Sequence, residues 1–94
     1  MKRVLILPSF DRSLKKLTPQ DRKKLSYSLE AFNCFLLSGE APQGLGFKKI
    51  NHDKYEFRVD IRLRVVVKVE NDDDYYLVLA GNHDEVKRYL RHFR

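Results

Sequence analysis

The sequence is poor in cysteine, with a single one, Cys34, among its 94 residues. A lone cysteine cannot form an internal disulfide bond, and this usage is typical of proteins in a reducing cytosol. Phe32, Phe35 and Leu36 surround Cys34 in the sequence. We therefore expect Cys34 to be a small buried hydrophobic residue rather than a nucleophile.

Long apolar runs are also missing. The N-terminal stretch MKRVLILPSF has a basic start, but its apolar run is too short for a signal-peptide core and no cleavage pattern follows it. No segment approaches the ~20 apolar residues that a membrane-spanning helix needs. The sequence therefore predicts a soluble, cytoplasmic protein with no membrane partner.

Signatures of metal and cofactor chemistry are not found. The three histidines, His52, His83 and His92, are scattered, and the Asp72–Asp74 run is typical of a polar turn. There is no glycine-rich phosphate loop and no serine-nucleophile motif. We expect neither a bound metal ion nor a cofactor.

Positive charge, in contrast, is abundant. Nineteen Lys and Arg against 13 Asp and Glu give a net charge of +6 and a sequence pI of about 9.6. Such a balance points to nucleic acid, an anionic membrane surface or an acidic protein as the partner. The length and the 43% hydrophobic content predict one domain, residues 1–94, with a modest core.

The N-terminal half predicts a strand followed by two helices. Arg3–Leu7 is a short apolar run that ends at Pro8, and Ser9 is a candidate cap for a helix bearing Phe10, Leu14 and Leu17. Thr18 and Pro19 are typical of a new helix start, and Gly39 of its end. The expected buried stripe of this second helix is Leu25, Leu29, Phe32 and Leu36.

The C-terminal half predicts four strands and a last helix. The strands are expected at 47–50, 54–60, 63–70 and 75–80. Asn82 and Glu85 have capping-box spacing for a helix whose apolar face is Val86, Tyr89, Leu90 and Phe93. The element order predicts an α+β domain. Its small, mostly antiparallel sheet would have the two N-terminal helices on one face and the other face partly open.

The stretch KYEFRVDIRLRVVVKV, residues 54–69, predicts a β-hairpin with an unusual charge pattern. Folding it near Ile61 places Arg58 opposite Arg64 and Lys54 opposite Lys68. Like charges directly opposed across a strand pair are destabilising. Either Glu56 and Asp60 offset the arginines diagonally on a solvated face, or the arginines grip an anion such as a phosphate or a partner carboxylate.

Two residues could turn this cationic face into a catalytic one. His83 lies at the predicted start of the last helix and is the histidine best placed to change protonation near neutral pH. Tyr89 lies on the apolar stripe of that helix, where core packing is the simpler role, although a tyrosine at a sheet edge could stack on a base.

The element order, the hairpin and the terminal LAGNHDEVKRYL together resemble the RelE/ParE superfamily of bacterial toxins from toxin–antitoxin systems. The resemblance spans essentially the whole chain and is strongest between Tyr55 and Leu90. It implies a small twisted sheet with a basic concave face. RelE-like members are metal-independent ribonucleases that cut mRNA on the ribosome and leave a 2′,3′-cyclic phosphate.

By this resemblance, Arg58 matches a cationic position on the first hairpin strand, and Arg64 matches the arginine on the second strand that holds the scissile phosphate. His83 falls where the family has an arginine or, in some branches, a histidine. Tyr89 matches an aromatic residue that stacks on a base and can take part in proton transfer. Glu56 departs from the family, where many members have a second cation, and is a further acid/base candidate. The RNA-binding residues would be Lys48, Lys49, Lys54, Arg62 and Lys68.

The resemblance also leaves alternatives open. A ParE-like member would inhibit DNA gyrase by binding, without catalysis, and an inactive relative would only bind an acidic partner. In each case the expected partner is an acidic antitoxin, disordered alone. Its apolar anchors would meet the helix grooves around Leu14, Leu17 and Leu25, while its carboxylates approach the hairpin arginines.

Overall fold

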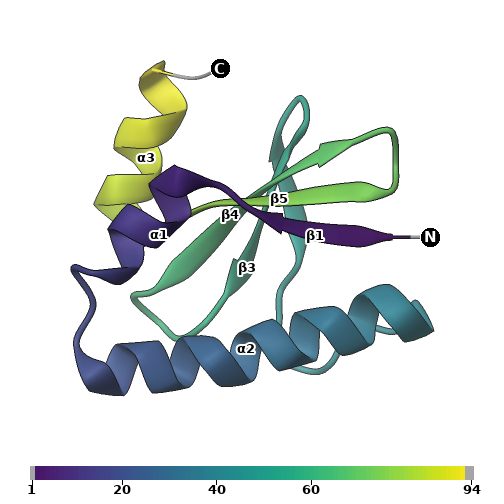
Figure 1. Ribbon diagram of the computed structural model, residues 1–94, viewed down its shortest axis with the longest axis horizontal. Coiled ribbons are helices and arrows are strands. Elements are labelled where there is room, and N and C mark those ends of the chain that lie inside the picture. Colours follow the sequence, from purple (N-terminus) through teal and green to yellow (C-terminus); the bar gives the residue numbers. More distant parts are fainter. Residues whose placement is uncertain (1, 93–94) are drawn as a thin grey trace.

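The computed structural model describes residues 2–92, which form three helices and one five-stranded sheet (Figure 1). The elements are β1 (Arg3–Ile6), α1 (Pro8–Leu14), α2 (Pro19–Ser38), β2 (Lys48–Asn51), β3 (Lys54–Arg58), β4 (Arg64–Glu70), β5 (Asp74–Gly81) and α3 (His83–His92). The strand order is β1-β5-β4-β3-β2, and only β1 runs parallel to its neighbour. The α+β prediction is confirmed.

The helix ends follow from local chemistry in two of three cases. The Thr18 hydroxyl accepts a hydrogen bond from Asp21 N at 3.1 Å, and Gly39 ends α2 with a φ of 80°. Asn82 and Glu85 exchange side-chain to backbone hydrogen bonds at 2.9 and 3.0 Å, which is the predicted capping box. These caps fix where α2 and α3 begin.

The prediction of Ser9 as a helix cap is wrong. Pro8 is already the first residue of α1, and Leu7 precedes it without a side-chain cap. The Ser9 hydroxyl instead donates to Val78 O at 2.6 Å, at an irregularity in the β4–β5 pairing. Ser13 accepts from Ala80 N at 3.0 Å, so two hydroxyl groups attach α1 to β5.

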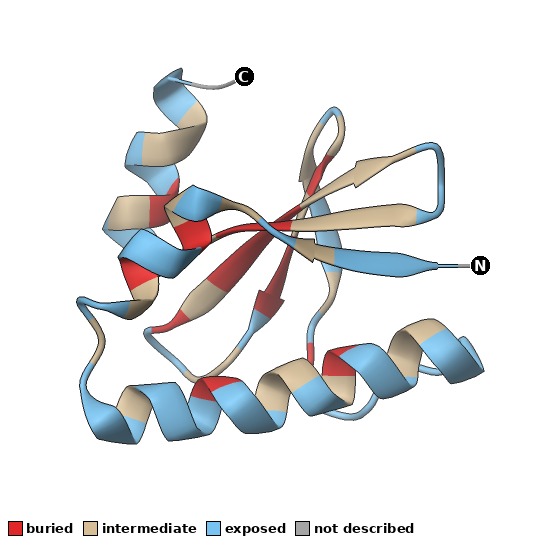
Figure 2. Cartoon of the chain, in the orientation of Figure 1, coloured by how far each residue is buried: buried red, intermediate tan, exposed pale blue. Residues whose placement is uncertain are grey.

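One face of the sheet packs against α1 and α2 around an aromatic cluster. Phe32 of α2 stacks on Phe57 of β3 with ring centroids 4.7 Å apart, and both are fully buried. The remaining fully buried members of this core are Phe10, Leu25, Val65, Val67, Leu77 and Ala80. Buried residues occur in the central strands β3, β4 and β5 and at separate positions along α1 and α2 (Figure 2).

The opposite face has a smaller core beneath α3. Val66, Val78 and Val86 are buried there, with Leu7, Ile50, Leu79, Tyr89 and Leu90 packed around them. The face is therefore partly covered by α3 rather than left to the hairpin cations alone. Phe93, expected on the apolar side of this helix, lies outside the described residues.

Cys34 is exposed, which contradicts the expected burial. Cys34 follows Phe32 by two residues on α2, and each residue of an α-helix turns about 100° round the axis. The Cys34 side chain therefore points about 200° away from the buried stripe. Neighbours in the sequence were mistaken here for neighbours in space.

Candidate active site on the α3 side of the sheet

The hairpin has the predicted register. Arg58 pairs with Arg64 and Lys54 with Lys68 as Cα partners between β3 and β4. Their side chains alternate with Phe57, Val65 and Val67, which enter the α2 core, so all four cations belong to the α3 side of the sheet. The period-two pattern was sufficient to fix this arrangement.

Three of the four opposed cations are paired with the chain's own carboxylates. Asp53 lies between the two lysines, with oxygens 3.2 Å from Lys54 Nζ and 3.9 Å from Lys68 Nζ. Lys68 Nζ also contacts Glu70 at 3.0 Å. Lys54 is 6% exposed, so a residue expected on an open RNA-binding surface is buried in an internal ion pair.

These contacts shift the ionisation of the groups involved. The hydrogen bond and charge of Glu70 raise the pKa of Lys68, against partial burial. Burial would raise the pKa of Asp53, but the hydrogen bond and charge of Lys54 outweigh it and lower that pKa. Both groups therefore keep their charges at neutral pH.

Arg64 is paired diagonally with Glu56 across the hairpin. Arg64 Nη1 lies 3.5 Å from Glu56 Oε2, and only 16% and 10% of the two side chains are exposed. The Nε of Arg64 is buried, and no described residue accepts a hydrogen bond from it. One edge of the guanidinium thus faces a carboxylate, while its Nε has a proton left to donate.

The matching role expected for Asp60 is wrong. Its carboxylate accepts hydrogen bonds from Arg62 N at 2.8 Å and Leu63 N at 2.7 Å and contacts Lys24 Nζ at 3.2 Å. It closes the β3–β4 turn and does not offset the arginines. Arg58 is exposed and makes no ion pair with any residue in the range 2–92.

The start of α3 lies close to Arg64. Gly81 is the Cα partner of Arg64 on β5, and His83 follows two residues later as the exposed first residue of the helix. A Cβ at Gly81 would come within 3.0 Å of Glu85 Cβ, so glycine allows the tight passage from β5 into the capping box. The backbones of Arg58, Arg64 and His83 therefore lie near the same end of the sheet.

Tyr89 lies further along α3, at the Lys68 end. Six residues of helix separate it from His83, a rise of about 9 Å. Burial raises the pKa of Tyr89, although the nearby charge of Lys68 opposes the shift. The phenol is therefore protonated at neutral pH.

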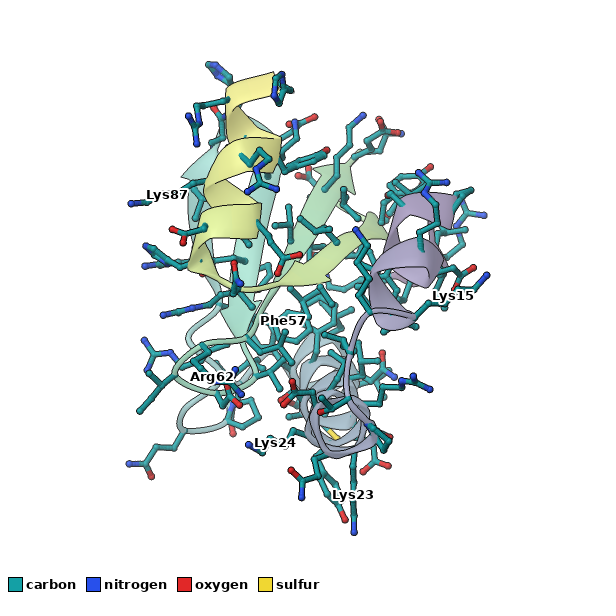
Figure 3. The ribbon with its side chains drawn as sticks, turned by 90° about the vertical axis from the view of Figure 1, so that its left-hand side faces the viewer. Lys15, Lys23, Lys24, Phe57, Arg62 and Lys87 are labelled. Atoms are coloured by element: carbon teal, nitrogen blue, oxygen red, sulfur yellow. The ribbon has the colours of Figure 1, made fainter. Side chains whose placement is uncertain are left out.

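The other predicted contact residues are spread around the molecule. Lys48 and Lys49 are exposed on the edge strand β2, with Lys48 opposite Glu56. Arg62 projects from the β3–β4 turn on the same side as Lys87, whereas Lys15 lies on the far side (Figure 3). Arg62 Nη2 lies 3.7 Å from Asp21, with 71% of the Arg62 side chain exposed.

The residues expected around an antitoxin groove are mostly interior. Leu25 is 2% exposed and belongs to the main core, and Leu14 and Leu17 pack against that core. Leu25 is therefore not available as a surface anchor. The exposed apolar side chains nearby are Tyr27 and Leu37 on α2, and Val4 and Ile6 on β1.

Sequence reasoning missed two exposed cations of α3 that lie beside a groove. Lys87 and Arg91 follow His83 at i+4 and i+8, and with Ile50 and Asn51 they line a groove between β2 and α3. Their spacing was visible in the sequence, but the proximity of β2 was not. Among residues 2–92 no group of three or more His, Cys, Asp and Glu side chains forms a metal site, and no helix is long and apolar enough to cross a membrane.

Comparison with solved structures identifies the fold. No sequence-family profile matches the chain, and no curated protein matches it. A chain of the RelB–RelE antitoxin–toxin complex from Methanococcus jannaschii superposes with a TM-score of 0.67 and 20% identity, over 90% of this chain and 96% of that one. A chain of the DinJ–YafQ complex from E. coli gives 0.68 and 13%, over 92% and 98%.

A third similar structure is the YoeB–YefM complex from Staphylococcus aureus, with a TM-score of 0.61 and 16% identity, over 88% of this chain and 98% of that one. Similarity at these identities establishes a shared architecture. The chain has the fold of the RelE-like toxins.

Proposed function

We propose that this protein is the toxin of a toxin–antitoxin pair and that it cleaves mRNA on the ribosome. Its fold is shared with toxins that were solved together with RelB, DinJ and YefM. The observation that favours catalysis is the position of Arg64. Its side chain is 16% exposed and lies on a strand beside Arg58 and Gly81, the residue that precedes the start of α3 by two positions.

The proposed reaction is an internal phosphoryl transfer. The 2′-oxygen of a ribose attacks the adjacent phosphorus and loses its proton to a base, while the bond from phosphorus to the 5′-oxygen breaks. The leaving 5′-oxygen takes up a proton, and the products are a 2′,3′-cyclic phosphate and a free 5′-hydroxyl. One proton is lost by the 2′-hydroxyl and one is gained by the 5′-oxygen, so the reaction needs one group that accepts a proton and one that donates a proton.

The side chains can be assigned to these tasks. The guanidinium groups of Arg64 and Arg58 would donate hydrogen bonds to the phosphate oxygens as negative charge develops, which is most effective from fixed cations. His83 would exchange a proton at the exposed end of the site, an effect worth roughly 10²–10⁴-fold. Tyr89, which is protonated at neutral pH, would donate a proton or stack on a base. Glu56 is the second candidate for the base that accepts the 2′-hydroxyl proton.

Mapping of mRNA 5′ ends after induction in growing cells tests the proposal. Cuts should appear within codons of translated messages and disappear from messages whose start codon is removed. An Arg64→Ala variant should arrest neither growth nor translation. Growth arrest with intact mRNA would refute cleavage.

A second candidate function is binding to DNA gyrase without catalysis. The observation that favours it is the pairing of Arg64 with Glu56, because a carboxylate occupies one edge of the arginine that the reaction needs. This function predicts stabilised double-strand DNA breaks and inhibition of supercoiling by purified gyrase. Neither effect is expected of a ribonuclease.

The proposed antitoxin is an acidic chain that orders on binding. The net charge of +6 and the exposed Arg58 favour a negatively charged segment. Its apolar anchors would meet exposed residues such as Leu37 rather than the buried Leu25. Reversing both Arg58 and Arg64 to Glu should weaken binding of that partner and abolish toxicity; a toxic double variant would contradict both roles.

A further inference from the structure

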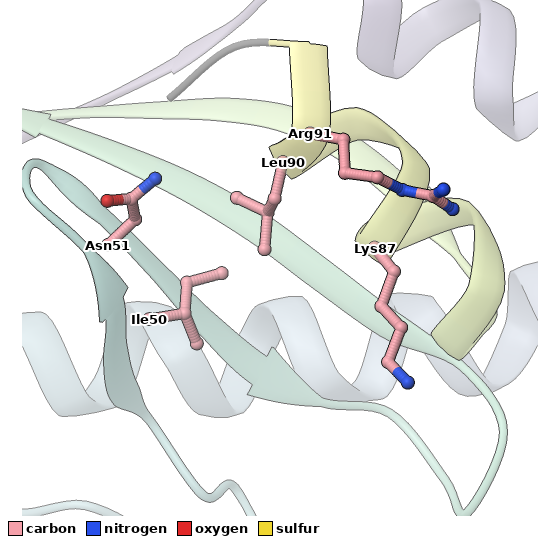
Figure 4. A pocket seen from close by; sticks show the side chains of 5 residues that line it. All are labelled: Ile50, Asn51, Lys87, Leu90 and Arg91. Carbon is pink, nitrogen blue, oxygen red and sulfur yellow. The ribbon is translucent and has the colours of Figure 1, made fainter.

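A groove runs between the edge strand β2 and the helix α3. It has a volume of about 550 Å³ and is lined by Ile50, Asn51, Lys87, Leu90 and Arg91 (Figure 4). We refer to these five residues as the α3 groove. Its volume is within the range of about 300–1,000 Å³ that small-molecule sites occupy.

The floor of the α3 groove is apolar. Ile50 and Leu90 face each other across it from β2 and α3 (Figure 4), and both pack against the buried Val66, Val78 and Val86. The floor is thus a continuation of the smaller core and is held in place by it. An apolar surface of this kind can contact the face of a base or the carbon atoms of a ribose.

The sides of the groove provide positive charge. Lys87 and Arg91 are exposed and one helical turn apart, and neither forms an ion pair with any residue between 2 and 92. In this they differ from Lys54 and Lys68, whose charges Asp53 and Glu70 already offset. The α3 groove therefore presents cations that are available to an external anion.

Asn51 adds a hydrogen-bond donor. Its Oδ1 accepts from His52 N at 2.8 Å, which fixes the amide orientation, and its NH₂ group makes no hydrogen bond to the described part of the chain. The groove thus combines an apolar floor, two cations and a neutral donor, and none of its lining residues is acidic.

The groove is also aligned with the candidate active site. His83, Lys87 and Arg91 recur at i, i+4 and i+8, so they lie along one side of α3 over a rise of about 12 Å. A polyanion following this row would pass from Arg91 to the His83 end, where Arg64 lies in the sheet.

We infer that the α3 groove binds single-stranded RNA next to the cleavage site, with phosphates on Lys87 and Arg91 and a base or ribose on Ile50 and Leu90. This inference rests on the proposed ribonuclease function and adds where the substrate strand lies. The main RNA contacts are then Lys87 and Arg91 of α3, and not Lys54 and Lys68 of the hairpin, whose charges are already paired.

The test compares two double variants that remove the same charge. Lys87→Gln with Arg91→Gln alters the groove, whereas Lys15→Gln with Lys23→Gln removes two exposed cations elsewhere, both without an ion pair in the described chain. Binding of a fluorescent ten-nucleotide single-stranded RNA is measured by anisotropy from 50 to 200 mM salt. Circular dichroism confirms that both variants fold.

The groove variant should bind about tenfold more weakly, and its slope of log K against log salt should fall by about 1.4, since each phosphate contact contributes ~0.7. The control should stay within about twofold of the unaltered chain. Equal losses in both variants would overturn the inference, because net charge alone would then explain them.

Two other results would also overturn it. In the first, the groove variant still binds RNA but no longer binds a ten-residue glutamate peptide. The groove would then be a binding site for an acidic protein segment. In the second, the unaltered chain does not bind the RNA. A chain that cuts mRNA in cells but binds RNA independently of Lys87 and Arg91 would retain the proposed function and lose only this inference.

Discussion

The two faces of the sheet are built from different chemistry. The face beneath α2 is closed by stacked and tilted aromatic rings, with Phe32 in contact with four of them. The face beneath α3 has three buried valines and, beside them, the nearly buried charges of Lys54, Glu56 and Arg64. Apolar burial stabilises the first face, whereas every buried charge on the second has a desolvation penalty to offset.

The difference indicates a division of labour. Replacing a buried ion pair by well-packed apolar residues is often neutral or stabilising, so such pairs are weak evidence for a stabilising role. The α2 face already provides a core for a chain of this size. The charges on the α3 face are therefore best explained by what they bind, and substitutions on the two faces should separate stability from activity.

Phe32→Ala should have the largest effect and act on stability. Removing a fully buried ring that contacts several others should cost about 3–5 kcal/mol of unfolding free energy, measured by urea titration at pH 7. Val86→Ala is the matched change on the α3 face and should cost at most about 2 kcal/mol, since two methyl groups are lost. Similar losses would show that the faces contribute equally.

Arg64→Gln should have the next largest effect and act on activity. Loss of the guanidinium should slow mRNA cleavage in a translation extract by about 10²–10³-fold, as for other fixed donors to a developing charge. The exposed Lys23→Gln removes a charge on the other side and should cleave normally. If the Arg64 variant cleaves slowly but is also largely unfolded, Arg64 contributes to folding, and the loss of cleavage does not indicate a catalytic role.

Features of the two faces that depend on residues close together in the sequence were predictable, whereas those that depend on contacts between distant segments were not. Local chemistry fixed the caps at Thr18 and Asn82, and the period-two alternation fixed the pairing of Arg58 with Arg64. These features depend on residues a few positions apart or on one continuous hairpin. The α+β order followed from them.

The errors arose where distant segments meet. Nothing in the hairpin pattern indicates that the turn residue Asp53 lies between Lys54 and Lys68, or that Lys54 becomes buried. The α3 groove needs β2 and α3 side by side, a contact set by tertiary packing. Cys34 is a different error, since helical geometry alone would have placed it away from Phe32.

Asp60→Ala tests the turn between β3 and β4 and should have an intermediate effect. The pKa of Asp60 is lowered below its ordinary 3.8, first by a hydrogen bond from Leu63 N. Partial burial opposes this shift, whereas the hydrogen bond from Arg62 N and the contact with Lys24 add to it. A lowered pKa stabilises the fold at pH values above 3.8, and this contribution is lost as the pH falls through the folded-state value.

The variant should therefore lose about 1–2 kcal/mol at pH 7, and the difference from the unaltered chain should shrink when both are unfolded by urea near pH 3. RNA affinity should not change, because Asp60 contacts neither Arg64 nor the α3 groove. A stability difference that persists unchanged at low pH would contradict the role of the ionised carboxylate.

Glu56→Gln should have the smallest effect and is the most informative about the α3 face. The Glu56 carboxylate lies 3.5 Å from Arg64 Nη1 and competes with any phosphate for that cation. Glutamine keeps the size and an acceptor oxygen but removes the competing charge. Affinity for the ten-nucleotide RNA should rise about two- to fivefold, corresponding to ~1 kcal/mol at most, because only one edge of the guanidinium faces Glu56.

The matched control is Glu30→Gln on the exposed side of α2, which changes the net charge equally and should leave affinity nearly unaltered. Cleavage then separates the two roles of Glu56. If the carboxylate only restrains Arg64, tighter binding should come with an undiminished cleavage rate. If it is the base that accepts the 2′-hydroxyl proton, binding should tighten while the rate constant falls by at least about tenfold. Equal gains in affinity for both variants would show that Glu56 acts through net charge rather than through its contact with Arg64.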